Sequence, residues 1–317
     1  MSANSSIPAI LGPTCCGKTA VAVAVARRSD GEVVSCDSMQ VYRELDKGTA
    51  KPTAVERAEV PHHLIDILGM DERCDANRFR ELAKSAIRDI QARGRMPVLA
   101  GGSGMYARSL IYDLPLLPSD EGVFRRVVDA ARTPKGMNAR QSEVAQRHPA
   151  TAEALRANPR RLMRAVEVLR LTGRLPDEQP ERAAQPRPNP SFRQFVLVPE
   201  PDLHRRWIRT RTADMLKNGW MEEVAALERR GLFDTPTARQ ALGYRDIADF
   251  LKAHTQPSKD EIEDLAEDLF LRTWHYARRQ RTWFRNQHPE AHRVPVDEEA
   301  TPESLAESIL SRLRQAR

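Results

Sequence analysis

Short apolar runs alternate with longer amphipathic stretches over the first third of the chain. PAIL at 8–11, GEVVSC at 31–36 and MPVLA at 96–100 have the length and composition of buried strands. DANRFRELAKSAIRDIQARGR at 75–95 has the residue spacing of an amphipathic helix. Strands and helices that alternate at these spacings predict an α/β fold with a doubly wound sheet of parallel strands.

One segment gives conflicting signals. AVAVAVA at 20–26 alternates with period two and would be a strand in isolation. It follows GPTCCGKT at 12–19, which matches the phosphate-binding pattern G-x-x-x-x-G-K-[ST]. Because such a loop leads into a helix whose N-terminal amides face the anion, we expect a helix from about Lys18 to Arg28. The core is therefore predicted to be P-loop NTPase-like.

The middle of the chain has a different pattern. Residues 119–190 look helical throughout and end in a proline-rich run, which favours an insertion on mobile connections. A strand pattern returns only at FRQFVLVPE, 192–200, and the rest looks mostly helical. We predict three segments: the first part of the core at 1–118, a helical insertion domain at 119–190, and the completed core with a basic helical C-terminal region at 191–317.

Composition and charge narrow the class of protein. The net charge of +6 is a mild lean toward an anionic partner. No run of about 18 apolar residues exists, so no membrane span is expected. The start lacks a basic leader, and a phosphate loop at Gly12 leaves no room for a cleaved presequence. The four cysteines include no CxxC pair, so we expect neither disulfides nor a zinc site built on cysteines, which fits a cytoplasmic protein. Separately, we expect a monomer.

The phosphate loop predicts a site for a phosphorylated ligand. Its backbone amides form a nest for phosphate oxygens, Lys18 supplies a point charge, and the Thr19 hydroxyl can hold Mg²⁺. Two cysteines inside the nest are best explained as small side chains that leave the amides free, with thiol redox sensitivity as the alternative. The expected phosphate-binding residues are Gly12, Pro13, Thr14, Cys15, Cys16, Gly17, Lys18 and Thr19.

Two further polar clusters follow predicted strands. Ligands of doubly wound folds gather at the carboxyl ends of the strands, where Asp37-Ser38 and the glycine-rich turn 101–104 should join the phosphate loop. The Asp37 carboxylate could hold Mg²⁺, act as a general base, or cap a turn. The residues alone leave these three roles open.

Basic residues gather in two predicted helices. RTWHYARRQRTWFR at 272–285 interleaves five arginines with aromatic residues, which suits single-stranded nucleic acid. The alternative is a solvated basic face beside an aromatic core stripe. NPRRLMRAVEVLR at 158–170 places Arg160, Arg161 and Arg164 on one turn.

Seven blocks in this order resemble the bacterial-type tRNA dimethylallyltransferase family, also called tRNA isopentenyltransferases. With the phosphate loop, the resemblance covers nearly all of residues 9–285. The blocks are CDSMQVYRELDKGTAKP at 36–52, VPHHLIDI at 60–67, GGSGMY at 101–106, NPRRLMRAVEVLRLTG at 158–173, RTRTADMLKNG at 209–219, RQALGY at 239–244 and RRQRTWFR at 278–285.

The resemblance implies transfer of a dimethylallyl group from dimethylallyl diphosphate to N6 of the adenosine 3′-adjacent to the anticodon, with release of diphosphate. It implies that Asp37 is the general base and that Arg211 and Lys18 stabilise the leaving diphosphate, together with Mg²⁺ and a hydrogen bond from Thr14. Ser103 stands where the family commonly has Thr, beside the attacked carbon. The serine keeps the hydroxyl and lacks a methyl group.

The same resemblance implies binding to the anticodon stem-loop of tRNA, with the target base flipped out of its stack. Asp37, Ser38, Met39 and Gln40 match the segment that receives the adenine, and the Gln40 amide could contact the base edge. The other implied tRNA contacts are Ser103, Arg161, Leu162, Met163, Arg164, Ala165, Gln240, Arg278, Arg279 and Arg281.

Two other classes share the phosphate loop. A P-loop kinase for a small metabolite needs neither the helical insertion nor the C-terminal arginine-aromatic helix. A non-catalytic RNA-binding ATPase would turn over ATP in an RNA-dependent way. Consumption of dimethylallyl diphosphate excludes both.

Overall fold

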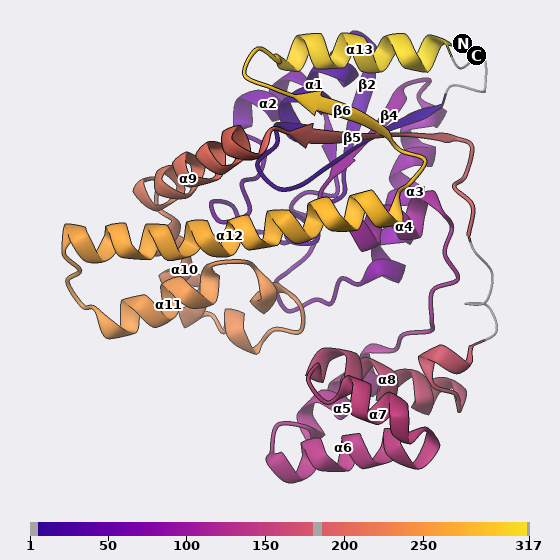
Figure 1. Ribbon diagram of the computed structural model, residues 1–317, viewed down its shortest axis with the longest axis vertical. Coiled ribbons are helices and arrows are strands. Elements are labelled where there is room, and N and C mark those ends of the chain that lie inside the picture. The colour runs from indigo at the N-terminus through magenta and orange to yellow at the C-terminus, as the bar shows by residue number, and fades with distance from the viewer. Residues whose placement is uncertain (1–5, 180–185, 316–317) are drawn as a thin grey trace. The chain divides into compact units, whose positions relative to one another are not determined.

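The computed structural model describes residues 6–179 and 186–315, which form two compact units (Figure 1). The larger unit comprises Met1–Asp113 and Pro188–Arg317, and the smaller is Leu114–Arg187. The expected domain boundaries at 118 and 190 lie a few residues C-terminal to these.

The larger unit is built on a six-stranded parallel sheet. The strand order is β3-β2-β4-β1-β5-β6, and every neighbouring pair is parallel. The predicted α/β fold with a P-loop in a parallel sheet is therefore confirmed. The strands are β1 (Ile7–Leu11), β2 (Gly31–Ser35), β3 (His62–His63), β4 (Met96–Gly101), β5 (Phe192–Pro199) and β6 (His292–Val296).

Helices cover both faces of the sheet. The connection through α1 runs from β1 to β2, and the connection through α3 runs in the opposite direction, from β3 to β4. Because parallel crossovers are right-handed, α1 and α3 lie on opposite faces. The helices of this unit are α1 (Lys18–Arg28), α2 (Ala54–Glu59), α3 (Ala76–Ala92), α4 (Gly104–Ile111), α9 (Pro201–Lys217), α10 (Trp220–Arg229), α11 (Tyr244–Ala253), α12 (Lys259–Gln287) and α13 (Pro302–Gln315).

The ambiguous alanine-valine run forms a helix, as predicted. Residues 21–26 of α1 are all buried, since the helix packs between the sheet and α13. A helix surrounded by apolar neighbours needs no polar face, so its sequence loses the 3.6-residue period. That is why the period-two pattern is misleading here.

The smaller unit is helical in its described residues, as predicted for the insertion. It contains α5 (Glu121–Ala130), α6 (Pro134–Arg147), α7 (Pro149–Leu155) and α8 (Pro159–Thr172). Each helix begins at a residue whose side chain accepts a backbone N–H from the first turn, and these caps define the helix starts. An apolar cluster of its own holds the four helices together.

Two edge strands, β3 and β6, have no clear signal in the sequence. β3 has only two residues, both histidines, and β6 carries a proline in its sequence HRVPV. Such strands are tolerated at the sheet edges, where one side of the backbone needs no partner. Among the described helices, none is both long and apolar enough to cross a bilayer.

Candidate active site

Three loops meet at the carboxyl edge of the sheet. β4 lies between β1 and β2, so the phosphate loop, Asp37 and the glycine-rich turn follow neighbouring strands. Together they line a cavity of about 510 Å³. Helices α9 and α12 contribute Arg211, Tyr276 and Gln280 to the same cavity. The structure therefore brings residues 14–19 of the phosphate loop, the predicted base and the predicted arginine clamp to one cavity, whereas Gly12 and Pro13 do not line it.

The phosphate loop depends on two glycines. Gly12 has φ +152°, and a Cβ there would lie 3.0 Å from the carbonyl oxygen of Leu197. Gly17 has φ +80° and begins α1 without a side-chain cap. Since no side chain occupies the N-terminus of α1, its first-turn N–H groups and dipole are left for an anion. Lys18 is held beside them by donation from Nζ to the carbonyl oxygen of Pro13, at 2.6 Å.

The two cysteines of the loop lie where burial favours the thiol over the thiolate. Cys16 is buried and Cys15 half-buried. Burial raises the pKa of both thiols and outweighs the opposing pull of Lys18 and Arg211. A neutral thiol is a poor nucleophile, which supports the interpretation of these residues as small loop side chains.

Arg211 reaches the phosphate loop from α9. Its Nη2 donates to Thr14 Oγ1 at 2.6 Å. This contact places the guanidinium at the cavity wall beside the loop, as the predicted role in diphosphate binding requires. The role itself remains a prediction.

Asp37 uses one carboxylate oxygen to hold its own turn. Oδ1 accepts the N–H groups of Met39 at 2.9 Å and Gln40 at 3.3 Å. Oδ2 has no hydrogen-bond partner in the part of the chain described. Turn capping, one of the three roles considered from the sequence, therefore occurs and leaves the second oxygen available to the cavity.

The glycine-rich turn packs closely on the segment before Asp37. A Cβ on Gly101 would lie 2.0 Å from the carbonyl oxygen of Cys36, so only glycine fits there. Ser103 N–H donates to the same oxygen at 3.2 Å, and Ser103 Oγ accepts Ser38 N–H at 2.9 Å. The hydroxyl of Ser103 thus fixes the turn that carries Asp37.

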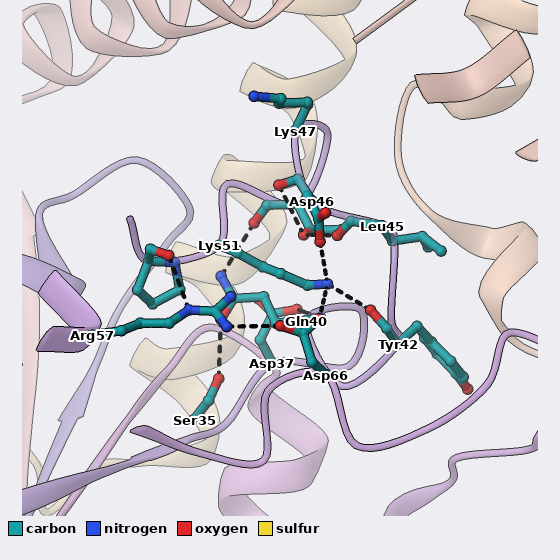
Figure 2. A network of polar contacts seen from close by, with 12 residues as sticks. Ser35, Asp37, Gln40, Tyr42, Leu45, Asp46, Lys47, Lys51, Arg57 and Asp66 are labelled. Atoms are coloured by element: carbon teal, nitrogen blue, oxygen red, sulfur yellow. Dashed lines mark hydrogen bonds and ion pairs between the residues drawn. The ribbon is translucent and has the colours of Figure 1, made fainter. Parts of the chain in front are cut away.

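The amide of Gln40 is engaged within the protein. Nε2 donates to the carbonyl oxygens of Thr49 and Ala50, both at 3.2 Å, and Oε1 accepts Ser35 Oγ–H at 3.0 Å (Figure 2). Contact of this amide with a base edge would need those bonds to be exchanged. The predicted tRNA contact at Gln40 is untested, and the structure shows a role in holding the loop 40–51.

Lys51 is a buried cation that the sequence did not single out. Its side chain is 3% exposed, and Nζ donates to Tyr42 O at 2.7 Å, Asp46 Oδ1 at 2.6 Å and Asp66 Oδ1 (Figure 2). Arg57 pairs with the other oxygen of Asp66 at 2.7 Å. A buried charge with its donors satisfied makes one arrangement of this loop strongly preferred.

The middle of the loop is held by a carboxylate on α10. Glu223 accepts the N–H groups of Asp46, Lys47 and Gly48 at 2.7–3.4 Å and the hydroxyl of Tyr244 at 2.6 Å. Tyr244 ends the RQALGY block. This block therefore helps to position the loop beside the cavity.

The predicted arginines of α12 lie on two sides of the helix. Arg278 and Arg279 are exposed and Arg281 is half-buried, and none of the three has a carboxylate partner among the described residues. Glu267, an acidic residue of the same helix, pairs with Arg209 of α9. Gln240 is exposed in a 3₁₀ turn.

The predicted contacts on the insertion are mostly part of its own core. Leu162, Met163 and Ala165 are at most 5% exposed. Arg164 donates to buried Glu167 at 2.7 Å and to Leu117 O at 2.8 Å. Arg161 alone of this group is exposed. The assignment of residues 161–165 to tRNA stays a prediction, with Arg161 the member best placed for a phosphate.

Two buried histidines make stability depend on pH. Burial lowers the pKa of His204 and of His288 to about 4, and nearby cations act in the same direction: Arg281, Lys18 and Arg211 at His204, and Arg108 and Arg293 at His288. Between pH 6.5 and 4 the unfolded chain binds protons that the folded chain excludes, so the free energy of unfolding falls as the pH drops through this range.

We expect each histidine to account for up to about 3 kcal/mol of that loss. Urea unfolding at pH 7 and pH 5 should therefore show a weaker pH dependence for His204→Gln than for the unmodified protein. His275→Gln, at an exposed position on α12, is the control and should change nothing. Equal pH dependence in all three proteins would contradict the prediction.

Comparison with known proteins gives the family. A model of the IPP transferase family matches residues 40–287. Proteins named tRNA dimethylallyltransferase are 40% identical over 87% of this chain and 85% of theirs in Kocuria rhizophila, and 38% identical over 98% and 97% in Kineococcus radiotolerans. The crystal structure of a tRNA isopentenylpyrophosphate transferase from Bacillus halodurans superposes with a TM-score of 0.68 at 32% identity, covering 98% of this chain and 97% of that one. These matches show that the chain belongs to the IPP transferase family, which includes the proteins named tRNA dimethylallyltransferase.

Proposed function

We propose that the protein transfers a dimethylallyl group from dimethylallyl diphosphate to N6 of the adenosine 3′-adjacent to the anticodon of tRNA. The observation that carries the proposal is that one cavity is lined by groups for both halves of the reaction. The N-terminus of α1 and Arg211 are suited to an anion, and the carboxylate of Asp37 is suited to accept a proton. Family membership supplies the transferred group and the class of acceptor.

In this reaction a bond forms between N6 and the allylic carbon while the bond from that carbon to the diphosphate oxygen breaks. The N6 lone pair is delocalised into the purine, so removal of the N6 proton helps the attack. Asp37 accepts that proton, since Oδ1 is held by the turn and Oδ2 is available. The electron pair of the broken bond leaves with the diphosphate.

The residues of the loop stabilise the departing charge. Lys18, Arg211 and the N-terminal amides of α1 are fixed before the reaction by their contacts with Pro13, Thr14 and the loop backbone. Fixed donors aimed at a developing negative charge lower the barrier without reorganisation. Ser103 acts through the turn of Asp37, whose Ser38 N–H it accepts.

The site suits Mg²⁺. The Thr19 hydroxyl, in the first turn of α1, lines the cavity as a hard oxygen donor. No cluster of three or more His, Cys, Asp or Glu side chains able to hold a metal occurs in residues 6–179 and 186–315. That donor set fits an ion that keeps several waters and binds mainly through substrate phosphates. When bound, Mg²⁺ would offset the diphosphate charge.

The partners follow from the same proposal: dimethylallyl diphosphate and the anticodon stem-loop of tRNA. The flipped adenine would enter beside Asp37, which lines the cavity, and beside Ser38 and Met39, which follow it in the chain and are half-buried. We also propose that the protein works in the cytoplasm and acts as a monomer.

The exposed arginines of α12 should contact tRNA phosphates. We expect the double change Arg278→Gln/Arg279→Gln to weaken tRNA binding and to reduce the slope of log K against log salt by about 1.4–1.8, which is two contacts. Binding is measured across a salt series, with circular dichroism to show that the fold is intact. Arg272→Gln is the control, because Arg272 is on the same helix and pairs with Asp246 at 3.0 Å. An unchanged slope in the folded double variant would assign these arginines to a solvated surface.

The proposed function is tested directly by mass spectrometry of tRNA nucleosides after incubation with the protein, Mg²⁺ and dimethylallyl diphosphate. The expected product is an adenosine carrying one dimethylallyl group, at the position next to the anticodon. ATP turnover with no prenylated nucleoside would instead favour a kinase or an ATPase.

A further inference from the structure

Thr14 is held at all three of its polar groups by distant parts of the chain. Its N–H donates to Gln280 Oε1 at 2.8 Å, its carbonyl oxygen accepts from His204 Nε2 at 2.8 Å, and its Oγ1 accepts from Arg211 Nη2 at 2.6 Å. His204 and Arg211 belong to α9, and Gln280 belongs to α12. The shape of the phosphate loop at Thr14 is therefore imposed from outside the loop.

The Gln280 side chain also contacts the glycine-rich turn. Its Nε2 donates to Gly102 O at 2.9 Å, so one amide spans the loops that follow β1 and β4. The side chain is 7% exposed, and a Cβ on Gly102 would lie 2.8 Å from its Nε2. Glycine at position 102 thus leaves room for the Gln280 carboxamide, whose oxygen and nitrogen both make hydrogen bonds.

We infer that Gln280 is a positioning residue that sets the phosphate loop and the glycine-rich turn in register. The inference deepens the proposed function and rests on it for the identity of the diphosphate. Because the Thr14 N–H is taken by Gln280, the anion is bound by the amides that follow Thr14, at the start of α1. In this role Gln280, which also lines the cavity, acts through its bonds to the two loops.

The relative position of the two loops matters for the reaction, because one loop supports the proposed base and the other holds the leaving group. The turn that begins at Gly102 continues into Ser103, which accepts Ser38 N–H beside the base Asp37. The phosphate loop carries Lys18 at the other end. A shift of the loops relative to each other would therefore change the separation between base and leaving group, and small misplacements of this kind are costly in rate.

The first test replaces Gln280 by a side chain of similar size. Gln280→Met removes both hydrogen bonds, while His204 still holds Thr14, so the fold should persist. Binding of inorganic pyrophosphate with Mg²⁺, measured by calorimetry without tRNA, should weaken about tenfold. Gln287→Met is the matched control, since Gln287 lies on the same helix and its side chain has no hydrogen bond among the described residues. Pyrophosphate binding should be unchanged in the control.

A second readout uses the prenyl-transfer reaction. Gln280→Met should lower kcat as well as raise the KM for dimethylallyl diphosphate, each by about tenfold, because both loops lose their register. A merely structural role would lower the melting temperature and leave kcat and pyrophosphate affinity unchanged. Pyrophosphate affinity and kcat within twofold of the unmodified protein, in a folded variant, would overturn the inference.

A third measurement needs no variant. Amide hydrogen exchange of the ligand-free protein should show protection of the Thr14 N–H, since Gln280 holds it without any bound anion. Exchange at the rate of a free loop would also overturn the inference. The pyrophosphate and exchange measurements do not depend on prenyl transfer, so a protein that binds pyrophosphate through this arrangement but prenylates no tRNA would disprove the proposed function alone.

Discussion

Asp37→Asn should keep tRNA and diphosphate binding and lose about 10²–10⁴-fold of the single-turnover rate, the usual effect of removing a positioned general base. The substitution preserves size and leaves an oxygen that can still accept the N–H groups of Met39 and Gln40. The turn therefore survives, and the change removes only the ability to take a proton. Because N6 is a weak nucleophile, little of the reaction should persist without that step.

The experiment is a single-turnover assay with saturating tRNA and dimethylallyl diphosphate. Asp297→Asn is the matched control: Asp297 also follows a strand and its Oδ1 accepts an N–H two residues on, from Glu299 at 3.1 Å, but it is exposed and lies outside the cavity. The control should react at the unmodified rate. A near-normal rate in Asp37→Asn would assign Asp37 to turn capping alone.

The parts of the site that directly follow a strand in the chain could be predicted from the sequence. The phosphate loop follows β1 and Asp37 follows β2, so local pattern and the rule for parallel sheets were enough to place them at one edge. The fold was predictable for the same reason, apart from the short edge strands, whose pairing depends on neighbours rather than on their own residues.

The contacts that join distant segments were not predictable in this way. Gln280 contacts Thr14 and Gly102 across 266 and 178 residues of sequence. In the local sequence, the role of Gln280 is indicated only by its position as a polar residue on the buried face of α12, between Ala277 and Phe284. The same pattern of buried positions marks Leu162 and Ala165 as core residues of α8, and both are buried, while the tRNA contact that the family resemblance implies for them stays a prediction.

The polar contacts of the loop 40–51 also could not be predicted from the sequence. The contact of Gln40 with a base stays a prediction, but the bonds of its amide to the backbone carbonyls of Thr49 and Ala50 were not foreseen, although a carboxamide in a turn readily finds such partners. Lys51 gave no signal, because a lysine is normally solvated and its burial depends on Asp46 and Asp66 folding around it. Such networks arise from tertiary structure, so single-residue preferences do not reveal them.

The Arg211 guanidinium should contribute more to the transition state than to substrate binding. In Arg211→Ala we expect kcat/KM for dimethylallyl diphosphate to fall by about 10²-fold, with a higher KM and a lower kcat. The diphosphate gains negative charge as it leaves, so a cation held at the cavity wall by Thr14 Oγ1 interacts more strongly with the transition state than with the bound substrate. tRNA affinity should be largely unchanged, because Arg211 lines the diphosphate cavity.

Steady-state kinetics and tRNA binding are measured together, with inorganic pyrophosphate as a competitive probe of the same site. Arg206→Ala is the control, since Arg206 is on the same helix, is exposed and pairs with Glu298 away from the cavity. Arg211→Lys separates charge from geometry: a lysine keeps the charge but lacks the planar fork that donates to Thr14 and an anion at once, so it should restore only part of the activity. If Arg211→Ala weakens tRNA binding alone, Arg211 contacts the RNA backbone, and the charge stabilisation at the diphosphate falls to Lys18 and the N-terminus of α1.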